Sequence, residues 1–485
     1  MRSSRGFASG LIVLGVLASA CSSDSKSTTA TTQASTSASV PTASAAPLGT
    51  TASANSTPAS TAIAATADTT AAGTAVTLDK AIATALAYTG GTAGAATGDP
   101  IKIGYVNEEG GTPAFPEATI GIESAVKYLN ADLGGAGGRP VELVKCITNS
   151  SEDSTKCAQQ MLADTSISFV MTGVIAQDAL VSPLLDALKG QKPVIIGNPV
   201  TTPEFLATDA FAYTPGSPGV IQGLAAFAAK YLPKGPAKKV AVVYGDNSGG
   251  QTAFTALTEP TLKALGVATV VGVPIADSAG PADFAPAITA AGAADADAFL
   301  PLVTVQGCIG TAQALKDLGV TTPVVTTGLC LGTPMTEYLK QQGGSGIVPD
   351  SWYFGGYGYS YFMPGDADTD AYITMIQQYA VDQKIDNIEY TGFAGPMFGN
   401  LLTVAKFINQ IGADKVSPDT IRTAAKAFAG PMWGVVGPMA CGASKVFVSV
   451  CGLEMGLQQY VGDKWVSVRD GYNNDPINPT TELGG

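Results

Sequence analysis

Histidine does not occur in this sequence of 485 residues. A Ser-His-Asp triad needs an imidazole to take the serine proton near neutral pH, and many zinc sites use histidine as a ligand. The sequence also has no GxxxxGK(S/T) motif, no GxGxxG after a strand and no cysteine pair with CxxC spacing. Phosphate loops and cysteine-based metal clusters depend on these motifs. We therefore predict no nucleotide or other cofactor and no metal site.

With one residue removed, segment 244–251, YGDNSGGQ, resembles the Gly-Asp-Ser-Gly-Gly motif that surrounds the nucleophilic serine of trypsin-like proteases. Because histidine is missing, Ser248 has no imidazole to activate it, and no lysine is spaced for a Ser-Lys pair. The adjacent Glu108 and Glu109 lack the spacing of an acid and a base that flank a substrate, so we expect an exposed acidic loop there. We predict that the protein is not an enzyme, and that Ser248 either contacts a ligand or caps a helix.

Charged residues make up only 13% of the chain, and 39 acidic residues face 26 basic ones. A surface with this balance is repelled by nucleic acid and by anionic lipid heads. We therefore expect no nucleic-acid partner. Any attachment to a membrane must come from something other than a basic patch.

The first 20 residues have the order of a secretory signal peptide. Two arginines precede the apolar run 11–17, which is too short to span a bilayer, and small residues lie before Cys21. This end resembles the lipobox of bacterial lipoproteins, although Ala18 stands where leucine is usual. We expect residues 1–20 to be removed and Cys21 to be lipidated, so that the protein is extracytoplasmic and anchored to the cell membrane. Secretion without a lipid is the alternative.

Residues 21–98 consist almost entirely of Ala, Thr, Ser, Gly and Pro. With so few large apolar side chains, the segment cannot bury enough surface to offset the entropy that is lost on ordering. We predict a flexible linker that lets a folded domain stand away from the membrane. Only Leu78–Tyr88 has a helical pattern, and disorder is the expected state there too.

Six of the seven cysteines follow the lipobox, and an even number in an exported chain suggests disulfide bonds. Six cysteines allow about fifteen pairings, so their order alone does not decide the connectivity. The pairing that closes the shortest loops joins sequence neighbours, and we expect it: Cys146 with Cys157, Cys308 with Cys330, and Cys441 with Cys451.

From residue 101 onward, short apolar segments alternate with amphipathic helical segments. This alternation predicts parallel sheets covered by helices on both faces. The expected strands lie at 101–106, 140–146, 167–173, 193–198, 238–245, 267–275, 296–303, 322–328 and 352–354. The expected helices lie at 117–133, 154–163, 177–188, 219–232, 251–265, 310–318 and 335–341. This part of the chain has about 385 residues, which is more than a single hydrophobic core usually contains, so we expect two domains. IKIGYVNEEGGTPAF and KVAVVYGDNSGGQTAF share a strand, a Gly-rich loop and a helix, and we expect each to open one domain.

Ligands of open α/β sheets bind beside the carboxyl ends of the strands, where free helix N–H groups also lie. Polar loops follow the expected strands at these ends, and the aromatic run WYFGGYGYSYF adds tyrosines that could line a cleft. A plain turn, a helix cap or core packing is the alternative role of each residue. The candidate ligand contacts are Asn107, Thr172, Asn198, Thr201, Ser248, Thr304 and Tyr357.

Several segments resemble one protein family. The lipobox, the linker and IKIGYVNEEGG are similar to bacterial ABC-transporter substrate-binding proteins, and more narrowly to the type I periplasmic binding proteins of the leucine/isoleucine/valine-binding family. Further similar segments are PVIIGNPVTTPEF, KKVAVVYGDNSGG, YTGFAGPMFGNLLTVAKFINQIG and the stretch from GVVGPMACG to LQQYVGDKWV. The resemblance covers about residues 100–470.

The resemblance implies an α/β fold of two Rossmann-like lobes with parallel sheets, joined by a three-segment hinge that closes around a ligand. Lobe 1 would take residues 99–216 and 357–440, and lobe 2 would take residues 217–356 and 441–485.

The resemblance also suggests ligand contacts. In amino-acid-binding members, the first lobe holds the ligand's carboxylate, and the matching positions here are Gln177 and Thr201. Those members hold the ammonium with an acidic residue and aromatics of the second lobe, whereas the matching loops here supply Ser248, Thr304 and Leu329. Burying an ammonium without a partner is unfavourable, so a small carboxylate or an amide fits as well as an amino acid.

The implied function is that of a monomeric solute-binding lipoprotein that captures a small polar molecule and delivers it to an ABC permease. Ligand would stabilise the closed form, and the permease would recognise that form. A receptor domain of the same fold, which senses a ligand without transport, is the alternative.

Overall fold

The computed structural model describes residues 76–111, 113–331, 333–341, 349, 351–357, 366–380, 392–461, 464–468 and 477–484. The described residues belong to one compact unit. The predicted signal peptide, Cys21 and the predicted linker up to residue 75 lie outside the described residues.

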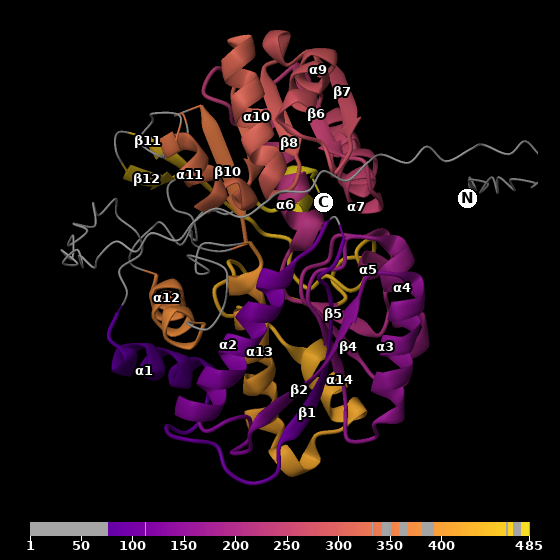
Figure 1. Cartoon of the computed structure of the whole chain (residues 1–485), viewed down its shortest axis with the longest axis vertical. Coiled ribbons are helices and arrows are strands. Elements are labelled where there is room, and N and C mark those ends of the chain that lie inside the picture. Colours follow the sequence, from indigo (N-terminus) through magenta and orange to yellow (C-terminus); the bar gives the residue numbers. More distant parts are fainter. Residues whose placement is uncertain are drawn as a thin grey trace, which may run out of the picture. The chain divides into compact units, whose positions relative to one another are not determined.

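Five parallel strands form the first sheet, in the order β2-β1-β3-β4-β5. The inner strand β1, between β2 and β3, is almost completely buried, as expected for an apolar run that is covered on both faces. The bounds of the strands are β1 Ile101–Glu108, β2 Val141–Thr148, β3 Val170–Thr172, β4 Val194–Ile196 and β5 Ala210–Ala212. The connecting helices are α2 Pro116–Asp132, α3 Ser151–Ala163, α4 Asp178–Leu188 and α5 Thr202–Leu206 (Figure 1).

Seven strands form the second sheet, in the order β12-β11-β10-β9-β8-β6-β7. Their bounds are β6 Lys239–Gly245, β7 Thr269–Ile275, β8 Ala298–Leu302, β9 Val324–Thr327, β10 Trp352–Gly356, β11 Gly456–Val461 and β12 Lys464–Ser467. Strands β6 to β10 are parallel, whereas β11 runs antiparallel to both β10 and β12. The expected parallel sheets are therefore confirmed, with an antiparallel pair added at one edge.

The two sheets share one strand order. The first strand of each set, β1 or β6, lies second from an edge, and the next strand along the chain lies outside it. The third, fourth and fifth strands then follow on the other side. The similar segments that begin at β1 and β6 thus occupy equivalent places in the two sheets.

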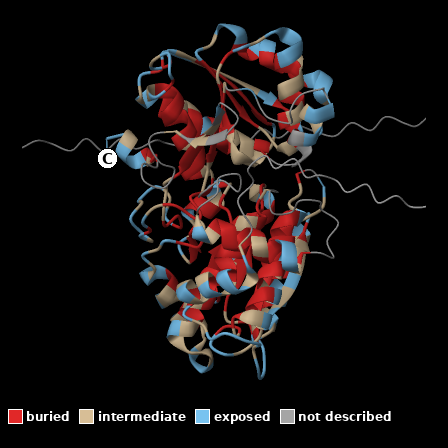
Figure 2. Ribbon diagram, turned by 90° about the vertical axis from the view of Figure 1, so that its left-hand side faces the viewer, coloured by how far each residue is buried: buried red, intermediate tan, exposed pale blue. Residues whose placement is uncertain are grey.

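Helices cover the faces of both sheets, and the buried segments in Figure 2 gather inside the upper and the lower body. The expected helix at 251–265 is helical but begins earlier, as α7 Ser248–Gln251, and continues through a π-helical stretch, η1 Thr252–Thr258, into α8 Glu259–Ala264. The further helices are α6 Gly216–Lys230, α9 Pro281–Ala291, η2 Ala293–Asp295, α10 Val305–Leu318, η3 Gly328–Leu331, α11 Thr333–Gln341, α12 Ala367–Tyr379, α13 Ala394–Ile411, η5 Ala413–Lys415, α14 Pro418–Ala427 and α15 Pro479–Glu482.

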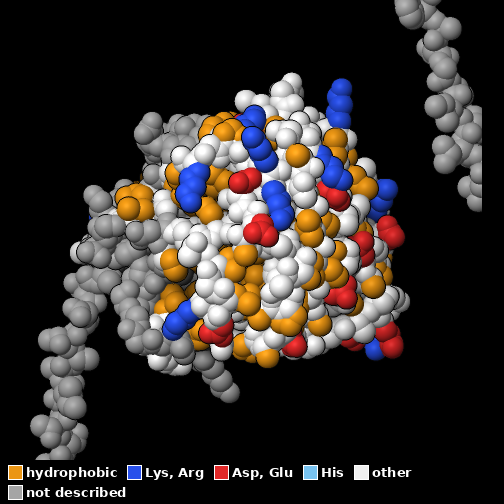
Figure 3. Space-filling model, turned by 90° about the horizontal axis from the view of Figure 1, so that it is seen from above, with side chains coloured by type: hydrophobic (Ala, Val, Ile, Leu, Met, Phe, Trp, Pro, Cys, Tyr) orange, Lys and Arg blue, Asp and Glu red, His pale blue; other side chains and the backbone are white. Residues whose placement is uncertain are grey.

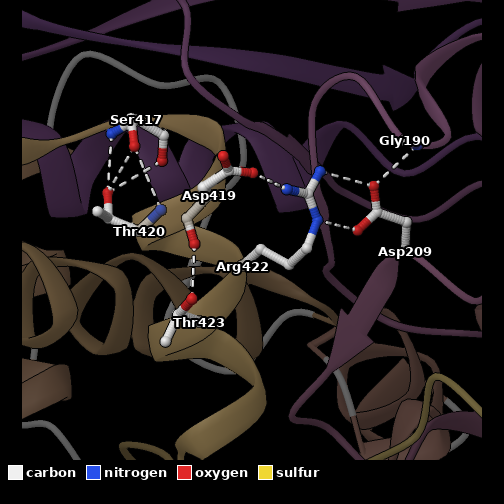
Figure 4. A network of polar contacts seen from close by, with 7 residues as sticks. All are labelled: Gly190, Asp209, Ser417, Asp419, Thr420, Arg422 and Thr423. Carbon is white, nitrogen blue, oxygen red and sulfur yellow. Dashed lines mark hydrogen bonds and ion pairs between the residues drawn. The ribbon is translucent and has the colours of Figure 1, made fainter.

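The chain returns to the first sheet after β10. Helix α13 packs against α2, and their apolar side chains share one core. Helix α14 is fixed by Arg422, whose guanidinium donates to both carboxylate oxygens of Asp209, at 2.6 and 3.0 Å, just before β5 (Figure 4). Asp209 also accepts the backbone N–H of Gly190. We call the body of β1–β5 with α12–α14 lobe 1, and the body of β6–β12 lobe 2.

Residues 78–89 correct the prediction of a disordered linker, because they form helix α1, Leu78–Thr89. The side chain of Thr77 caps its start, and Gly90 ends it with a left-handed φ of 68°. Ala81 and Ala85, one turn apart, are completely buried, and α1 packs against α12 and α13 (Figure 1). A face of small side chains lets the helix approach closely, although it offers little apolar area.

The three disulfide bonds join the expected cysteines: Cys146 with Cys157, Cys308 with Cys330, and Cys441 with Cys451. Basic and acidic side chains are interspersed on the face of lobe 2 that Figure 3 shows. Within the described ranges, no helix is both long and apolar enough to cross a membrane.

Candidate ligand-binding site

A cavity of about 570 Å³ lies between loops of lobe 1 and loops of lobe 2. The loops after β1, β3 and β4 contribute from lobe 1, and those after β6, β7, β8 and β9 contribute from lobe 2. These are the carboxyl ends of parallel strands, where ligands of open α/β sheets bind. The volume is typical of a site for a small organic molecule.

The wall of the cavity is mainly apolar and aromatic. Valine, leucine and isoleucine side chains come from both lobes, and aromatic rings come from several segments that are far apart in the sequence. The larger apolar and aromatic lining residues include Phe115, Val200, Val220, Ile221, Leu302, Leu329, Leu331, Tyr357, Tyr372, Phe393 and Trp433. Such a wall suits a ligand with an apolar body.

Several helices begin at the cavity. Residues in the first turns of α2, α6, α7, α10, α12 and α13 are among those that line it. The N-cap residue of α10, Thr304, makes no side-chain cap bond, and Val305 and Gln306 lie at the wall. Free N–H groups at a helix start favour a carboxylate or another electron-rich group.

Three carboxyl groups also line the cavity, although none was among the predicted contacts. Burial raises the pKa of Glu117 from its ordinary value of 4.5 to about 7, and the pKa of Asp368 from 3.8 to about 6. Asp277, after β7, is held by Asn247, whose Nδ2 donates to the two carboxylate oxygens at 2.8 and 2.7 Å. The described part of the lining contains no lysine or arginine.

A family model described as periplasmic binding protein matches residues 100–445, which include β1–β10 and most of the cavity wall. The chain belongs to the periplasmic binding protein family. The predicted family and the fold that it implies are thereby confirmed. No curated protein sequence matches the chain significantly.

Solved structures of periplasmic binding proteins share this fold. A solute-binding protein of an ABC transporter from Rhodopseudomonas palustris HaA2, in complex with p-hydroxybenzoic acid, is 17% identical with a TM-score of 0.61; the alignment covers 80% of this chain and 99% of that one. LivJ of Streptococcus pneumoniae, in complex with isoleucine, is 18% identical with a TM-score of 0.55, covering 76% and 99%. A fatty acid ABC transporter substrate-binding protein of Thermomonospora curvata is 15% identical with a TM-score of 0.58, covering 80% and 97%.

The eight predicted contacts fall into two groups in this periplasmic binding protein. Asn198, Thr304 and Tyr357 line the cavity. The other five lie in neighbouring loops and hold protein groups instead: Asn107, Thr172, Gln177, Thr201 and Ser248.

Two of these five side chains shape the loops after the strands of lobe 1. The Oδ1 of Asn107 accepts the backbone N–H of Val174 at 2.9 Å, and its Nδ2 donates to the carbonyl of Phe115 at 2.8 Å. The hydroxyl of Thr172 accepts the backbone N–H of Gly197 at 3.3 Å. Both side chains therefore act on the backbone that bears the cavity wall.

Thr201 is completely buried and forms the capping box of α5 with Glu204. Its hydroxyl donates to Oε2 of Glu204 at 3.0 Å, and the same oxygen accepts the backbone N–H groups of Val200 and Thr201. The hydroxyl that we expected to meet a ligand carboxylate thus meets a carboxyl group of the protein.

Gln177 makes a comparable contact. Its Nε2 donates to Oε1 of Glu108 at 2.6 Å, while Oε2 of Glu108 accepts the backbone N–H of Ala176 at 2.8 Å. Glu108 is fully buried, and this burial raises its pKa. The expected exposed acidic loop is therefore wrong for Glu108, because its carboxyl group fixes the loop before α4.

Proposed function

We propose that this chain is the extracytoplasmic solute-binding lipoprotein of an ABC transporter, and that it encloses a small, largely apolar organic molecule between its two lobes. The observation that carries the proposal is the cavity of about 570 Å³, which is lined by the carboxyl-end loops of both sheets. Membership in the periplasmic binding protein family supports the transport role and the location outside the cytoplasm.

The lining supports a ligand with an apolar body and one or two polar groups. The start of α10 offers N–H groups to a carboxylate or hydroxyl, and Asp277 offers a partner for an ammonium that the sequence alone did not reveal. Aromatic acids, fatty acids and apolar amino acids all have such a form. The three solved relatives, with their aromatic acid, isoleucine and fatty-acid descriptions, support the same range.

The chain passes between the lobes three times: after β5, after β10, and between α14 and β11. We propose that these three segments form the hinge and that the predicted lobe boundaries lie within them. Ligand that contacts both walls would favour the closed form, and a permease would recognise that form. No covalent step is needed for this function.

A thermal-shift screen with aromatic acids, fatty acids, amino acids and amides tests the proposal, since a ligand of the folded state must raise the melting temperature. For each hit, affinity is compared between wild type and Asp277→Asn, with Asp295→Asn, an exposed carboxylate of lobe 2, as the control. Weaker binding in Asp277→Asn alone would show that an ammonium of the ligand contacts Asp277, and unchanged binding would show that the ligand makes no such contact. No stabilisation by any class would contradict the proposed ligand range.

Uptake of the hit by cells tests the transport role separately. Deletion of the gene should abolish uptake of the labelled compound. Uptake that continues unchanged would favour the receptor alternative.

A further inference from the structure

Helix α1 precedes residue 100, where the match to the family begins, and yet it is fixed to lobe 1. At its start, the hydroxyl of Thr374 in α12 donates to the carbonyl of Val76 at 2.9 Å. At its end, Nδ2 of Asn409 in α13 donates to the carbonyl of Thr89 at 2.9 Å. The helix is thus an ordered part of this chain that the family pattern does not include.

One side chain of α1, Tyr88, reaches a segment that borders the cavity. Its hydroxyl accepts the backbone N–H of Trp433 at 3.0 Å and donates to the carbonyl of Pro431 at 3.2 Å. It also shares a hydrogen bond of 2.8 Å with the hydroxyl of Thr403 in α13. The ring of Tyr88 meets the ring of Trp433 edge-on, with 5.4 Å between the centroids. Nζ of Lys406 lies 4.3 Å from the centroid of the Tyr88 ring.

The segment that Tyr88 holds is part of the cavity wall. Trp433, Gly434 and Val435 all line the cavity, and the side chain of Trp433 is almost fully buried. Two further contacts fix this segment: Oδ2 of Asp368 accepts the N–H of Gly434 at 3.1 Å, and the carbonyl of Tyr357 accepts the N–H of Val436 at 2.8 Å. Asp368 and Tyr357 line the cavity themselves.

Residues 433–436, which include this part of the wall, are therefore held by three different elements. Tyr88 of α1 holds Trp433, α12 holds Gly434 through Asp368, and the end of β10 holds Val436 through Tyr357. Of these anchors, only Tyr88 lies outside the part of the chain that matches the family.

We propose that Tyr88 is a positioning residue of the ligand site: its hydroxyl sets the place of the Trp433–Val435 wall, so that helix α1 is a functional part of the binding domain rather than the end of a spacer. The proposal rests on the proposed function only in that the cavity is the ligand site. It predicts that a chain which lacks α1 folds around β1–β12 but binds its ligand more weakly.

The full exported chain with Tyr88→Phe tests the position of the wall without any ligand. This variant keeps the ring, and with it the edge contact to Trp433, and loses only the hydroxyl. The matched control is Thr374→Val, which loses the anchor at Val76, at the opposite end of α1 from Tyr88 and the wall. Hydrogen–deuterium exchange is measured for the amides of residues 432–436.

We expect these amides to exchange roughly five- to ten-fold faster in Tyr88→Phe and at the wild-type rate in Thr374→Val. Unchanged exchange in Tyr88→Phe would overturn the proposal. Equal acceleration in both variants would also overturn it, because α1 would then act only through general stability.

A second measurement links the wall to binding. The probe is p-hydroxybenzoate, and its affinity is compared for wild type, Tyr88→Phe and Thr374→Val. We expect a loss of about three- to ten-fold in Tyr88→Phe alone. Equal affinity in all three proteins would overturn the functional role of Tyr88. If the wild-type protein does not bind the probe, the proposed aromatic-acid class fails, while the exchange experiment still decides whether Tyr88 positions the wall.

Discussion

The side-chain oxygen of Ser248 lies 2.9 Å from the backbone nitrogen of Asp178 and accepts its hydrogen bond. Ser248 begins α7 in lobe 2, whereas Asp178 begins α4 in lobe 1, whose own N-cap residue, Gln177, makes no cap bond. The same hydroxyl donates to the carbonyl of Ala176 at 3.3 Å. A serine of one lobe therefore caps a helix of the other, and the contact exists only while these loops are together.

Ser248→Ala removes this contact between the lobes. We expect the ligand-free protein to shift toward the open form and the ligand to bind more weakly by about 1 kcal/mol, the usual contribution of a helix cap. Small-angle scattering without ligand should give a larger radius of gyration, and calorimetry with the screening hit should give the lower affinity.

Ser150→Ala is the matched control for Ser248→Ala. Ser150 accepts the N–H of Asp153 at 3.1 Å and caps α3 within lobe 1. Its loss should lower the melting temperature and leave the scattering curve and the affinity unchanged. Identical scattering and affinity for Ser248→Ala and wild type would show that the contact does not influence closure.

The disulfide between Cys308 and Cys330 connects two elements of the cavity wall. Cys308 lies in α10, which contributes Val305 and Gln306, and Cys330 lies in η3, which contributes Leu329. Replacement of both cysteines by alanine should lower the unfolding free energy by about 3 kcal/mol and also weaken ligand binding, because the two loops are no longer tied together.

Replacement of Cys146 and Cys157 by alanine gives the comparison. That bond joins β2 and α3, and neither element contributes to the described lining. We expect chemical denaturation to show a similar loss of unfolding free energy, and we expect the affinity for the ligand to stay unchanged. Equal weakening of binding in both double variants would mean that the Cys308–Cys330 bond has no specific role at the site.

The buried capping box of α5 predicts a pH-dependent stability. Burial raises the pKa of Glu204 from its ordinary value of 4.5 to about 8, and its Oε1 has no hydrogen-bond partner among the described residues. Between these two values the folded state keeps a proton that the unfolded state releases. The contribution of this group to stability is therefore present below about pH 4.5 and is lost as the pH rises through about 8.

Glu204→Gln keeps an oxygen for the N–H groups of Val200 and Thr201 and removes the titration. Thermal unfolding from about pH 5 to about pH 9 should show a flatter decline, with the variant more stable at the alkaline end by on the order of 1 kcal/mol. Glu337→Gln, at an exposed carboxylate, should follow wild type. A parallel decline for Glu204→Gln and wild type would contradict the protonation of Glu204.

The fold could be predicted well where apolar runs are long. Strand β6 contains the run Val240–Val243, which is entirely buried. In a chain where strands and helices alternate, such an apolar run predicts a buried strand of a parallel sheet. Strand β5, Ala210–Ala212, has only three residues and was missed. Helix α1 was predicted to be disordered in spite of its helical pattern, because its segment has few large apolar side chains, and its buried residues Ala81 and Ala85 offer little apolar area. Its place depends on a close fit against α12 and α13, which composition does not express.

The site was less predictable because polar residues beside a cavity can serve either ligand or backbone. Asn198 and Thr304 line the cavity as expected, whereas the hydroxyl of Thr201 donates its hydrogen bond to Glu204. The carboxyl groups of Asp277 and Asp368 were missed, because no candidate contact was placed after the strand at 267–275 and because Asp368 lies in the first turn of α12, a helix that the sequence did not predict. Asp277 comes after the edge strand β7, and its link to Asn247 of the YGDNSGGQ loop is visible only in three dimensions.

The predicted lipid on Cys21 lies outside the described residues and can be tested in cells. The chain carries a net charge of −13, so its surface should not bind anionic lipid by itself, and acyl chains on Cys21 would have to supply the anchor. Cys21→Ser should move the protein from the membrane fraction to the medium and abolish incorporation of labelled palmitate. Ser23→Ala, which keeps Cys21 and the signal peptide, is the control. Continued membrane retention of Cys21→Ser would contradict lipidation and show that some other part of the chain holds the membrane.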